Sequence, residues 1–177
     1  MVITLIVEDG SVVTDANTFV TISGADDYFE AYGETAWVGT DASGTGAPTD
    51  TVKQQALLKA MKYLNNLPWK GIRYDEDQSL AWPRSDVYDR DGLLVAEDTV
   101  PKVVVAAQCE LALRSLPTSD IDLQPDLERG GKVTAESVGQ LARSFSSSAP
   151  TRVVVTVVDD MLAGLLKNKR IVSVMRG

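Results

Sequence analysis

Two stretches of the chain carry apolar residues at helical spacing. In residues 51–66, apolar side chains recur every three or four positions, and lysines and glutamines fall largely on the other side. Residues 101–116 are apolar on most faces, and Glu110 and Arg114, four residues apart, mark a narrow polar face. Pro101 suits a first helical turn. The pattern therefore predicts two helices, of which the second lies at the centre of the fold.

Two shorter helices are predicted from less regular patterns. Ser23 is typical of a helix N-cap, and residues 24–32 follow it up to Gly33, which can end a helix in the left-handed conformation. Near the C-terminus, either of two aspartates can cap a helix over residues 161–167. The β-branched run over residues 153–158 favours an extended lead-in to that helix.

Extended segments and loops account for the rest of the chain. Residues 2–7 are apolar and β-branched, and a turn with a returning strand can follow them. Residues 37–50 are small and polar, which predicts a flexible loop, and residues 132–145 alternate loosely, which predicts a β segment. We expect three parts: a β arm or hairpin (1–22), a helical core (23–151), and a C-terminal helix with a tail (152–177). The predicted fold class is mainly α (α+β), a small bundle of about three to four helices with short β-hairpins and extended N- and C-terminal arms.

The composition removes several chemistries. The 177 residues include one cysteine and no histidine, so a Ser–His–Asp triad, a Cys–His pair and a four-ligand zinc site of nitrogen and sulfur are excluded. Cys109 lies in the most apolar helix without a basic neighbour in sequence, which predicts a buried structural thiol. We expect a protein that is not an enzyme and that uses no cofactor and no metal.

Three aspartates before Gly92 resemble part of a calcium-binding loop. If Gly92 takes the sixth position of an EF-hand loop, Asp89 and Asp91 take the third and fifth, while Asp86 lies outside the loop. Val87 then stands at the first position, where it cannot ligate, and the twelfth position lacks the bidentate glutamate. A tight hairpin turn is therefore the favoured interpretation.

Aromatic and basic residues are concentrated between residues 69 and 84. Local packing, with the arginines paired to nearby carboxylates, is the favoured interpretation. Stacking of single-stranded bases is a second one, and the acidic residues 75–77 oppose it. A subunit contact is the third, because Trp, Tyr and Arg commonly anchor interfaces. The residues singled out for core packing or a subunit contact are Trp69, Arg73, Trp82 and Arg84.

The last residues of the chain are basic and then apolar. Exposed apolar residues in such a tail would be a liability unless another surface covers them. Packing on the same chain and docking on a partner are both open interpretations. The candidate partner-contact residues are Lys167, Lys169, Arg170, Ile171, Val172, Val174, Met175 and Arg176.

An ordered set of short segments resembles a group of tailed-bacteriophage proteins. These segments are Val7–Gly10, Ala16–Thr21, Ala25–Phe29, Trp69–Arg73, Gln78–Arg84, Asp89–Gly92 and Val100–Pro101, followed by Glu110-Leu111-Ala112. The group is similar to the head–tail connector adaptors that sit below the portal, and it is often labelled DnaT-like single-stranded-DNA-binding. The resemblance covers residues 5 to 145, and the order of the segments carries it rather than any single motif.

The adaptor resemblance implies a structural virion protein. Its expected partners are the portal protein, further copies of itself in a ring of twelve, and a tail or head-completion protein. DNA would pass through the ring without specific binding, and no membrane would be involved. The expected location is the head–tail junction of the virion, after synthesis in the bacterial cytoplasm. The tail residues listed above would grip the portal.

Charge favours the adaptor over the DNA-binding label. Residues 1–151 hold 12 bases and 23 acids, a net charge of −11, whereas residues 152–177 hold 5 bases and 2 acids, a net charge of +3. Phosphate contacts from Lys and Arg supply much of the affinity for nucleic acid, so an acidic body predicts weak binding. The alternative is a single-stranded-DNA-binding replication accessory protein.

Overall fold

The protein is mainly α-helical, as predicted. The computed structural model describes residues 4–119, 123, 135–138, 141–144 and 155–167. The helices in these residues are α1 (Ile22–Tyr32), α2 (Thr35–Val38), α3 (Asp50–Asn65), α4 (Lys102–Arg114) and α5 (Thr156–Leu162). The strands form two antiparallel pairs, β1 (Ile72–Arg73) with β2 (Arg84–Ser85) and β3 (Ala135–Val138) with β4 (Leu141–Ser144).

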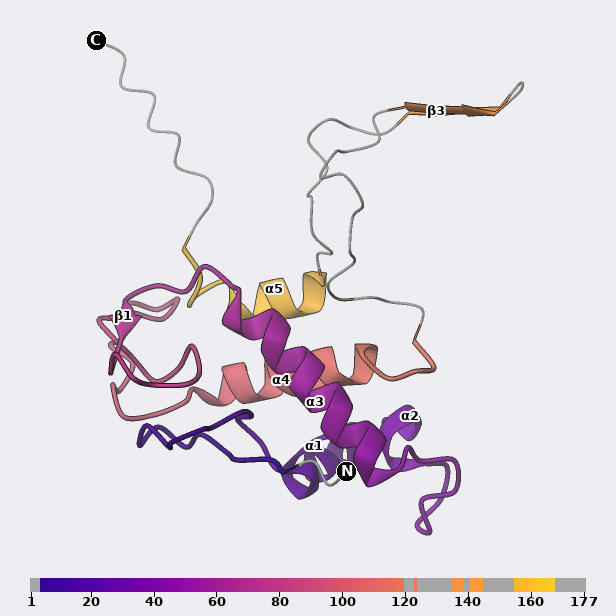
Figure 1. Ribbon diagram of the computed structural model, residues 1–177, viewed down its shortest axis with the longest axis horizontal. Helices are drawn as coiled ribbons and strands as arrows, with labels where there is room; N and C mark the ends of the chain where they lie inside the picture. Colours follow the sequence, from indigo (N-terminus) through magenta and orange to yellow (C-terminus); the bar gives the residue numbers. More distant parts are fainter. Residues whose placement is uncertain (1–3, 120–122, 124–134, 139–140, 145–154, 168–177) are drawn as a thin grey trace.

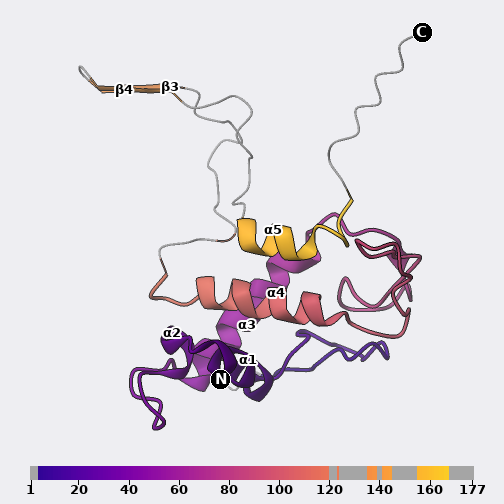
Figure 2. The ribbon, with the colours of Figure 1, turned by 180° about the vertical axis from the view of Figure 1, so that it is seen from behind.

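Helix α4 lies at the centre of the helices. It packs against α3, α5 and α1, and the two opposite views place α5 on one side of it and α1 on the other (Figure 1, Figure 2). Val104, Ala107 and Leu111 of α4 are completely buried. The predicted central position of this helix is confirmed, because a helix that is apolar on most faces needs neighbours on most sides.

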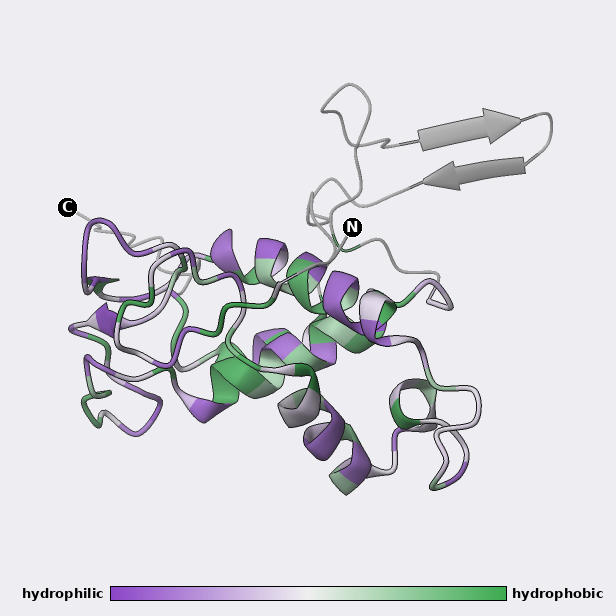
Figure 3. Cartoon of the chain, turned by 60° about the horizontal axis from the view of Figure 1, so that its bottom comes forward, coloured by the Kyte–Doolittle hydropathy of each residue, from purple (hydrophilic) through white to green (hydrophobic). Residues whose placement is uncertain are grey.

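Helix α3 follows the predicted amphipathic spacing, with its bounds shifted by one residue. Its apolar positions face α4, and helix faces of opposite polarity are visible along the bundle (Figure 3). Lys53 is an exception, because the sequence pattern put it on the polar side and the structure buries it. Its Nζ lies 2.8 Å from Oδ1 of Asp26, which also accepts a hydrogen bond from Nε1 of Trp37 at 2.7 Å.

A buried amide joins α4 to two other parts of the chain. The Gln108 side chain is fully buried. Its Oε1 accepts a hydrogen bond from the backbone N–H of Phe19 at 2.9 Å. Its Nε2 donates to Oγ1 of Thr18 at 2.8 Å and to the carbonyl of Leu57 in α3 at 3.2 Å. The amide therefore fixes the N-terminal arm and α3 against α4 at one point.

The N-terminal arm differs from the predicted hairpin. Val7 pairs in parallel with Thr18, and the predicted returning strand does not form. The buried Glu8 carboxylate accepts three backbone N–H groups between Gly10 and Val13. Val12 and Val13 lie in the segment predicted to return as a strand, so the side chain takes backbone donors that a strand ladder would otherwise use.

Two helix boundaries also differ from the prediction. Helix α1 begins at Ile22 after Thr21, whose side chain accepts from the N–H of Gly24, so Ser23 is not the cap. Helix α5 begins at Thr156, inside the run predicted to be extended. Val158 and Leu162 are both completely buried, which shows that packing against α4 outweighs the weak helix preference of β-branched residues.

The remaining predictions divide between described and undescribed residues. The predicted flexible segment 37–50 begins within α2, where Trp37 is buried. The predicted β segment 132–145 contains β3 and β4. Of the candidate tail residues, Lys167 is described and residues 168–177 lie outside the described part. None of the described helices has the length and hydropathy needed to cross a membrane.

Replacing the buried amide should destabilise the whole bundle. In Gln108→Leu, three hydrogen bonds disappear and the N–H of Phe19 loses its partner, so we expect a loss of about 2–3 kcal/mol in the free energy of unfolding. Urea denaturation followed by circular dichroism measures this loss. Gln55→Leu on the exposed side of α3 is the matched control and should change the free energy by less than about 0.5 kcal/mol. Equal effects of the two substitutions would contradict a role for the buried amide.

Candidate functional site

Arg84 organises the irregular segment that follows α3. Its Nε donates to the carbonyl of Lys70 at 2.7 Å, its Nη1 to the carbonyl of Ala81 at 3.0 Å, and its Nη2 to the carbonyl of Gly71 at 3.1 Å. The sequence-based expectation that Arg84 pairs with a carboxylate is therefore wrong. Five N–H donors on a rigid plane allow one guanidinium to bind several carbonyls, and two donors remain after these three bonds.

A glycine permits the close approach of β1 and β2. Gly71 has a φ of +64°, and a Cβ at this position would lie 2.1 Å from the carbonyl oxygen of Ser85. The two strands pair with Ile72 opposite Ser85 and Arg73 opposite Arg84. Residues directly opposite in an antiparallel pair share a face, so both arginines lie on the same side of this hairpin.

The segment after α5 lies along the start of the same region. Leu166 pairs with Trp69 in an antiparallel bridge. The N–H of Lys70 donates to the carbonyl of Leu165 at 2.9 Å, and the N–H of Lys167 donates to the carbonyl of Pro68 at 2.8 Å. This pairing brings Lys167 to the two arginines, although about eighty residues or more separate it from them in the sequence.

These elements line an open hollow of about 260 Å³ in which every charged lining residue is basic. Arg73, Arg84 and Lys167 contribute the charges, and Asn65 and Trp69 contribute to its wall. We call this site, defined by the three basic residues, the cationic hollow. No acidic side chain is among the described residues that line it. This arrangement stands out in a chain with a formal net charge of −8.

Two of the three basic residues of the cationic hollow are fully available to a ligand. Arg73 and Lys167 are exposed, and their side chains make no hydrogen bond or ion pair with another described residue. Burial and the neighbouring charge of Arg73 lower the pKa of the Arg84 guanidinium, which nevertheless stays charged. An anion between the arginines would relieve their repulsion, so the site is suited to a phosphate or a carboxylate.

The two tryptophans of this region are part of the core. Trp69 and Trp82 are 4% and 0% exposed, and their rings meet edge to face with centroids 5.7 Å apart. Nε1 of Trp69 donates to the carbonyl of Leu64 at 2.9 Å. Neither ring can therefore stack on a base, and Tyr74 is the aromatic residue between positions 69 and 84 that is exposed.

The predicted hairpin turn near Gly92 is present. One carboxylate oxygen of Asp89 accepts the backbone N–H groups of Asp91 and Leu93, both at 2.9 Å. Tyr88 pairs with Leu94 across this turn. Asp89 thus stabilises the turn, and no group of three or more potential metal ligands occurs among the described residues.

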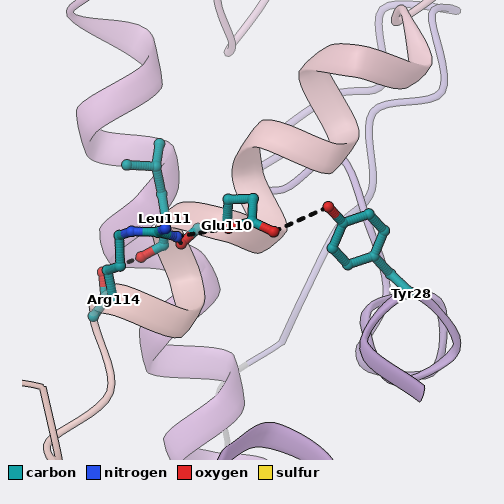
Figure 4. Close-up of polar contacts among 5 residues, drawn as sticks. Tyr28, Glu110, Leu111 and Arg114 are labelled. Carbon is teal, nitrogen blue, oxygen red and sulfur yellow. Dashed lines mark hydrogen bonds and ion pairs between the residues drawn. The ribbon is translucent and has the colours of Figure 1, made fainter. Parts of the chain in front are cut away.

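Strongly perturbed titratable groups lie between α1 and α4 and do not line the cationic hollow. Glu110 accepts a hydrogen bond from the Tyr28 hydroxyl at 3.1 Å and forms an ion pair with Arg114 at 2.6 Å (Figure 4). Burial and the charge of Glu110 raise the pKa of Tyr28. Burial, with a smaller effect of Glu110, raises the pKa of Cys109 to about 12. The buried thiol is as predicted, and a thiol of this kind is a poor nucleophile.

Comparison with protein families identifies the chain. Residues 3–177 match the model of the family described as "Putative DnaT-like ssDNA binding protein". The chain belongs to this DnaT-like family. No curated protein and no solved structure matches it.

Membership of the DnaT-like family corrects the head–tail adaptor prediction. The family model supports the alternative of a single-stranded-DNA-binding protein, and it is at odds with a portal-bound ring through which DNA passes unbound. The portal, the ring of twelve copies and the tail or head-completion partner are withdrawn with the adaptor. The absence of enzyme activity and the location of the protein stay untested predictions, and the family match gives no support to a place in the virion.

The whole-chain charge misled the sequence analysis for a physical reason. A sum over residues 1–151 treats every acid as equally close to the ligand, whereas the charged residues in the wall of the cationic hollow are all basic. The sequence points to Arg73 and Arg84. It does not predict that these two residues lie together with Lys167 and Asn65. No local signal reveals it, because β1–β2 pairing and the 68–70 to 165–167 pairing both depend on the tertiary fold.

A conservative change of Arg84 should loosen the region around the cationic hollow. Lysine carries its donors on one nitrogen and cannot reach three separate carbonyls, so Arg84→Lys should lower the free energy of unfolding by about 1–2 kcal/mol. Amide hydrogen exchange should become faster in residues 70–86. Arg90→Lys is the control, since Arg90 is exposed and makes one 3.3 Å bond, to the carbonyl of Asp160. Unchanged hydrogen exchange in Arg84→Lys would show that the three hydrogen bonds of Arg84 are not needed to hold residues 70–86 in place.

The Tyr28 contact should make stability depend on alkaline pH. Because the pKa of Tyr28 is raised in the folded protein, the unfolded chain ionises first, and stability falls as the pH rises past the usual tyrosine pKa of about 10. Tyr28→Phe should therefore lose less stability between about pH 9 and pH 11 than the wild type. Urea denaturation at each pH measures the difference. Tyr88→Phe, a change at a tyrosine that is 53% exposed, should follow the wild-type slope.

Proposed function

We propose that the protein binds single-stranded DNA and that the cationic hollow holds the phosphate backbone. The observation that supports this most directly is the hollow itself, where Arg73, Arg84 and Lys167 converge without an acidic neighbour in the described wall. Family membership supports the same ligand class. Arginine forks and a lysine are the usual protein partners of phosphate.

The shape of the site favours a flexible strand over a duplex. Proteins that read a duplex commonly insert a helix or a two-stranded ribbon into a groove. Here the basic groups come from the hairpin face and from the segment after α5, and they line a concavity rather than a protruding helix. A single strand can bend its backbone into such a concavity.

The acidic remainder of the chain shapes the expected affinity. Non-specific binding depends on the number of phosphates that basic side chains neutralise. Three basic groups in the described site imply a small number of contacts, and the net charge of −8 disfavours adhesion elsewhere on the protein. We therefore expect binding that is moderate, confined to the cationic hollow and weakened by salt.

Removing the free basic groups should reduce both the affinity and its dependence on salt. Arg73→Ala and Lys167→Ala should each weaken binding to a labelled oligothymidine and lower the slope of log K against log salt by roughly 0.7. Fluorescence anisotropy over a series of salt concentrations measures both quantities. Neither substitution removes a side-chain bond to a described residue, so both variants should fold.

The control variant removes a positive charge that lies away from the cationic hollow. Lys59→Ala removes an exposed lysine from α3 that does not line the cationic hollow, and it should leave the slope unchanged. An equal loss of affinity in all three variants would place the binding energy in overall charge rather than in the hollow. Absence of wild-type binding at low salt would overturn the proposed function.

A further inference from the structure

The exposed apolar residues of the described chain are concentrated in residues 72–94, which connect α3 to α4. The large apolar side chains with the greatest exposure number seven, and five of them belong to the hairpin and turn in this segment: Ile72, Tyr74, Tyr88, Leu93 and Leu94. The other two, Tyr32 and Val157, lie on α1 and α5. A concentration of this kind is typical of a binding surface.

The loop that carries Tyr88 is tied to the wall of the cationic hollow. Nζ of Lys70 donates to the carbonyl of Tyr88 at 3.4 Å, while the carbonyl of Lys70 accepts from Arg84. Gly71 also lies against Val87, because a Cβ on the glycine would be 2.7 Å from Cγ2 of that valine. The loop that carries Tyr88 therefore lies beside the β1–β2 hairpin that carries the two arginines, at the end of the molecule where β1 is labelled (Figure 1).

The β1–β2 hairpin separates basic from apolar side chains. Arg73 shares a face with Arg84 because the two residues are directly opposite. Alternation along a strand puts Ile72 and Tyr74 on the other face, and the N–H of Tyr74 still bonds to the carbonyl of Pro83 at 3.3 Å. Tyr74 and Tyr88 are 49% and 53% exposed, so each presents much of its surface to a ligand.

We propose that a strand with its phosphates in the cationic hollow passes around the edge of the hairpin, where Tyr74 and Tyr88 stack on its bases. This inference rests on the proposed function. Aromatic side chains beside a basic groove are the common means of holding single strands without regard to sequence. Arg73 directly precedes Tyr74, and Arg90 follows Tyr88 by two residues, so each ring has a cation close to it in the chain.

Carboxylates near the tyrosines would orient the strand. Asp75, Glu76 and Asp77 follow Tyr74 and are exposed, and the aspartates of the turn surround Tyr88 in sequence. Like charge repels phosphate from these positions and leaves the bases as the part of the strand that approaches the rings. The acidic residues that oppose simple phosphate binding thus favour one orientation of the strand, with its backbone toward the hollow.

The test compares a normal strand with one that lacks bases. Tyr74→Ala and Tyr88→Ala should each weaken binding to oligothymidine by on the order of tenfold. Binding to an abasic strand of the same length should change by less than about twofold, since that strand has nothing to stack. Tyr74→Phe and Tyr88→Phe should retain nearly full affinity, because stacking needs the ring and not the hydroxyl. Tyr32→Ala is the matched control, an exposed tyrosine on α1.

Each other outcome overturns the inference. Equal losses for normal and abasic strands would show that the tyrosines only support the fold of the hollow. No loss for either strand, with Arg73→Ala still defective, would remove stacking and leave the proposed function intact. A wild-type dimer in sedimentation that Tyr88→Ala dissociates, without any effect on DNA, would assign the surface to a second copy of the chain.

Discussion

The structure depends on one buried amide. Gln108 sits where the N-terminal arm, α3 and α4 meet, and it bonds to Phe19, Thr18 and Leu57. Apolar contacts along α3 and α4 would tolerate small slides of one helix on the other, since hydrophobic attraction has no direction. A buried amide does not tolerate them, because each group that loses its partner costs about 1–3 kcal/mol. The amide therefore selects one register for the three segments.

The position of α4 determines the shape of the cationic hollow through α3 and through α5. Along α3, the helix ends at Asn65, whose Oδ1 accepts the N–H of Ala81 at 2.9 Å and thereby holds the segment that Arg84 clamps. Along α5, the helix packs on α4 and then delivers residues 165–167 to the edge of residues 68–70. The positions of Arg73, Arg84 and Lys167 thus all depend on the same helices.

The sequence predicted those parts of the fold that local pattern determines. The spacing of Ala56, Ala60 and Tyr63 identifies α3, and the apolar faces of α4 identify the centre of the bundle. The start of α5 was missed, because burial of Val158 against α4 overrides the preference of β-branched residues for extended structure. The site was missed for a similar reason. The sequence offers the residue types near Arg84, but burial removes both tryptophans from the surface, and only tertiary pairing brings Lys167 to the arginines.

Net charge and local charge affect the binding of a charged ligand in different ways. At physiological ionic strength, interactions between exposed charges fade over about 8 Å. A phosphate in the cationic hollow therefore responds mainly to Arg73, Arg84 and Lys167 rather than to the 25 acids of the whole chain. The distant acids still act before contact, when they disfavour adhesion of nucleic acid to the rest of the surface. An acidic protein can thus bind a polyanion at one place, and its overall charge restricts the binding to that place.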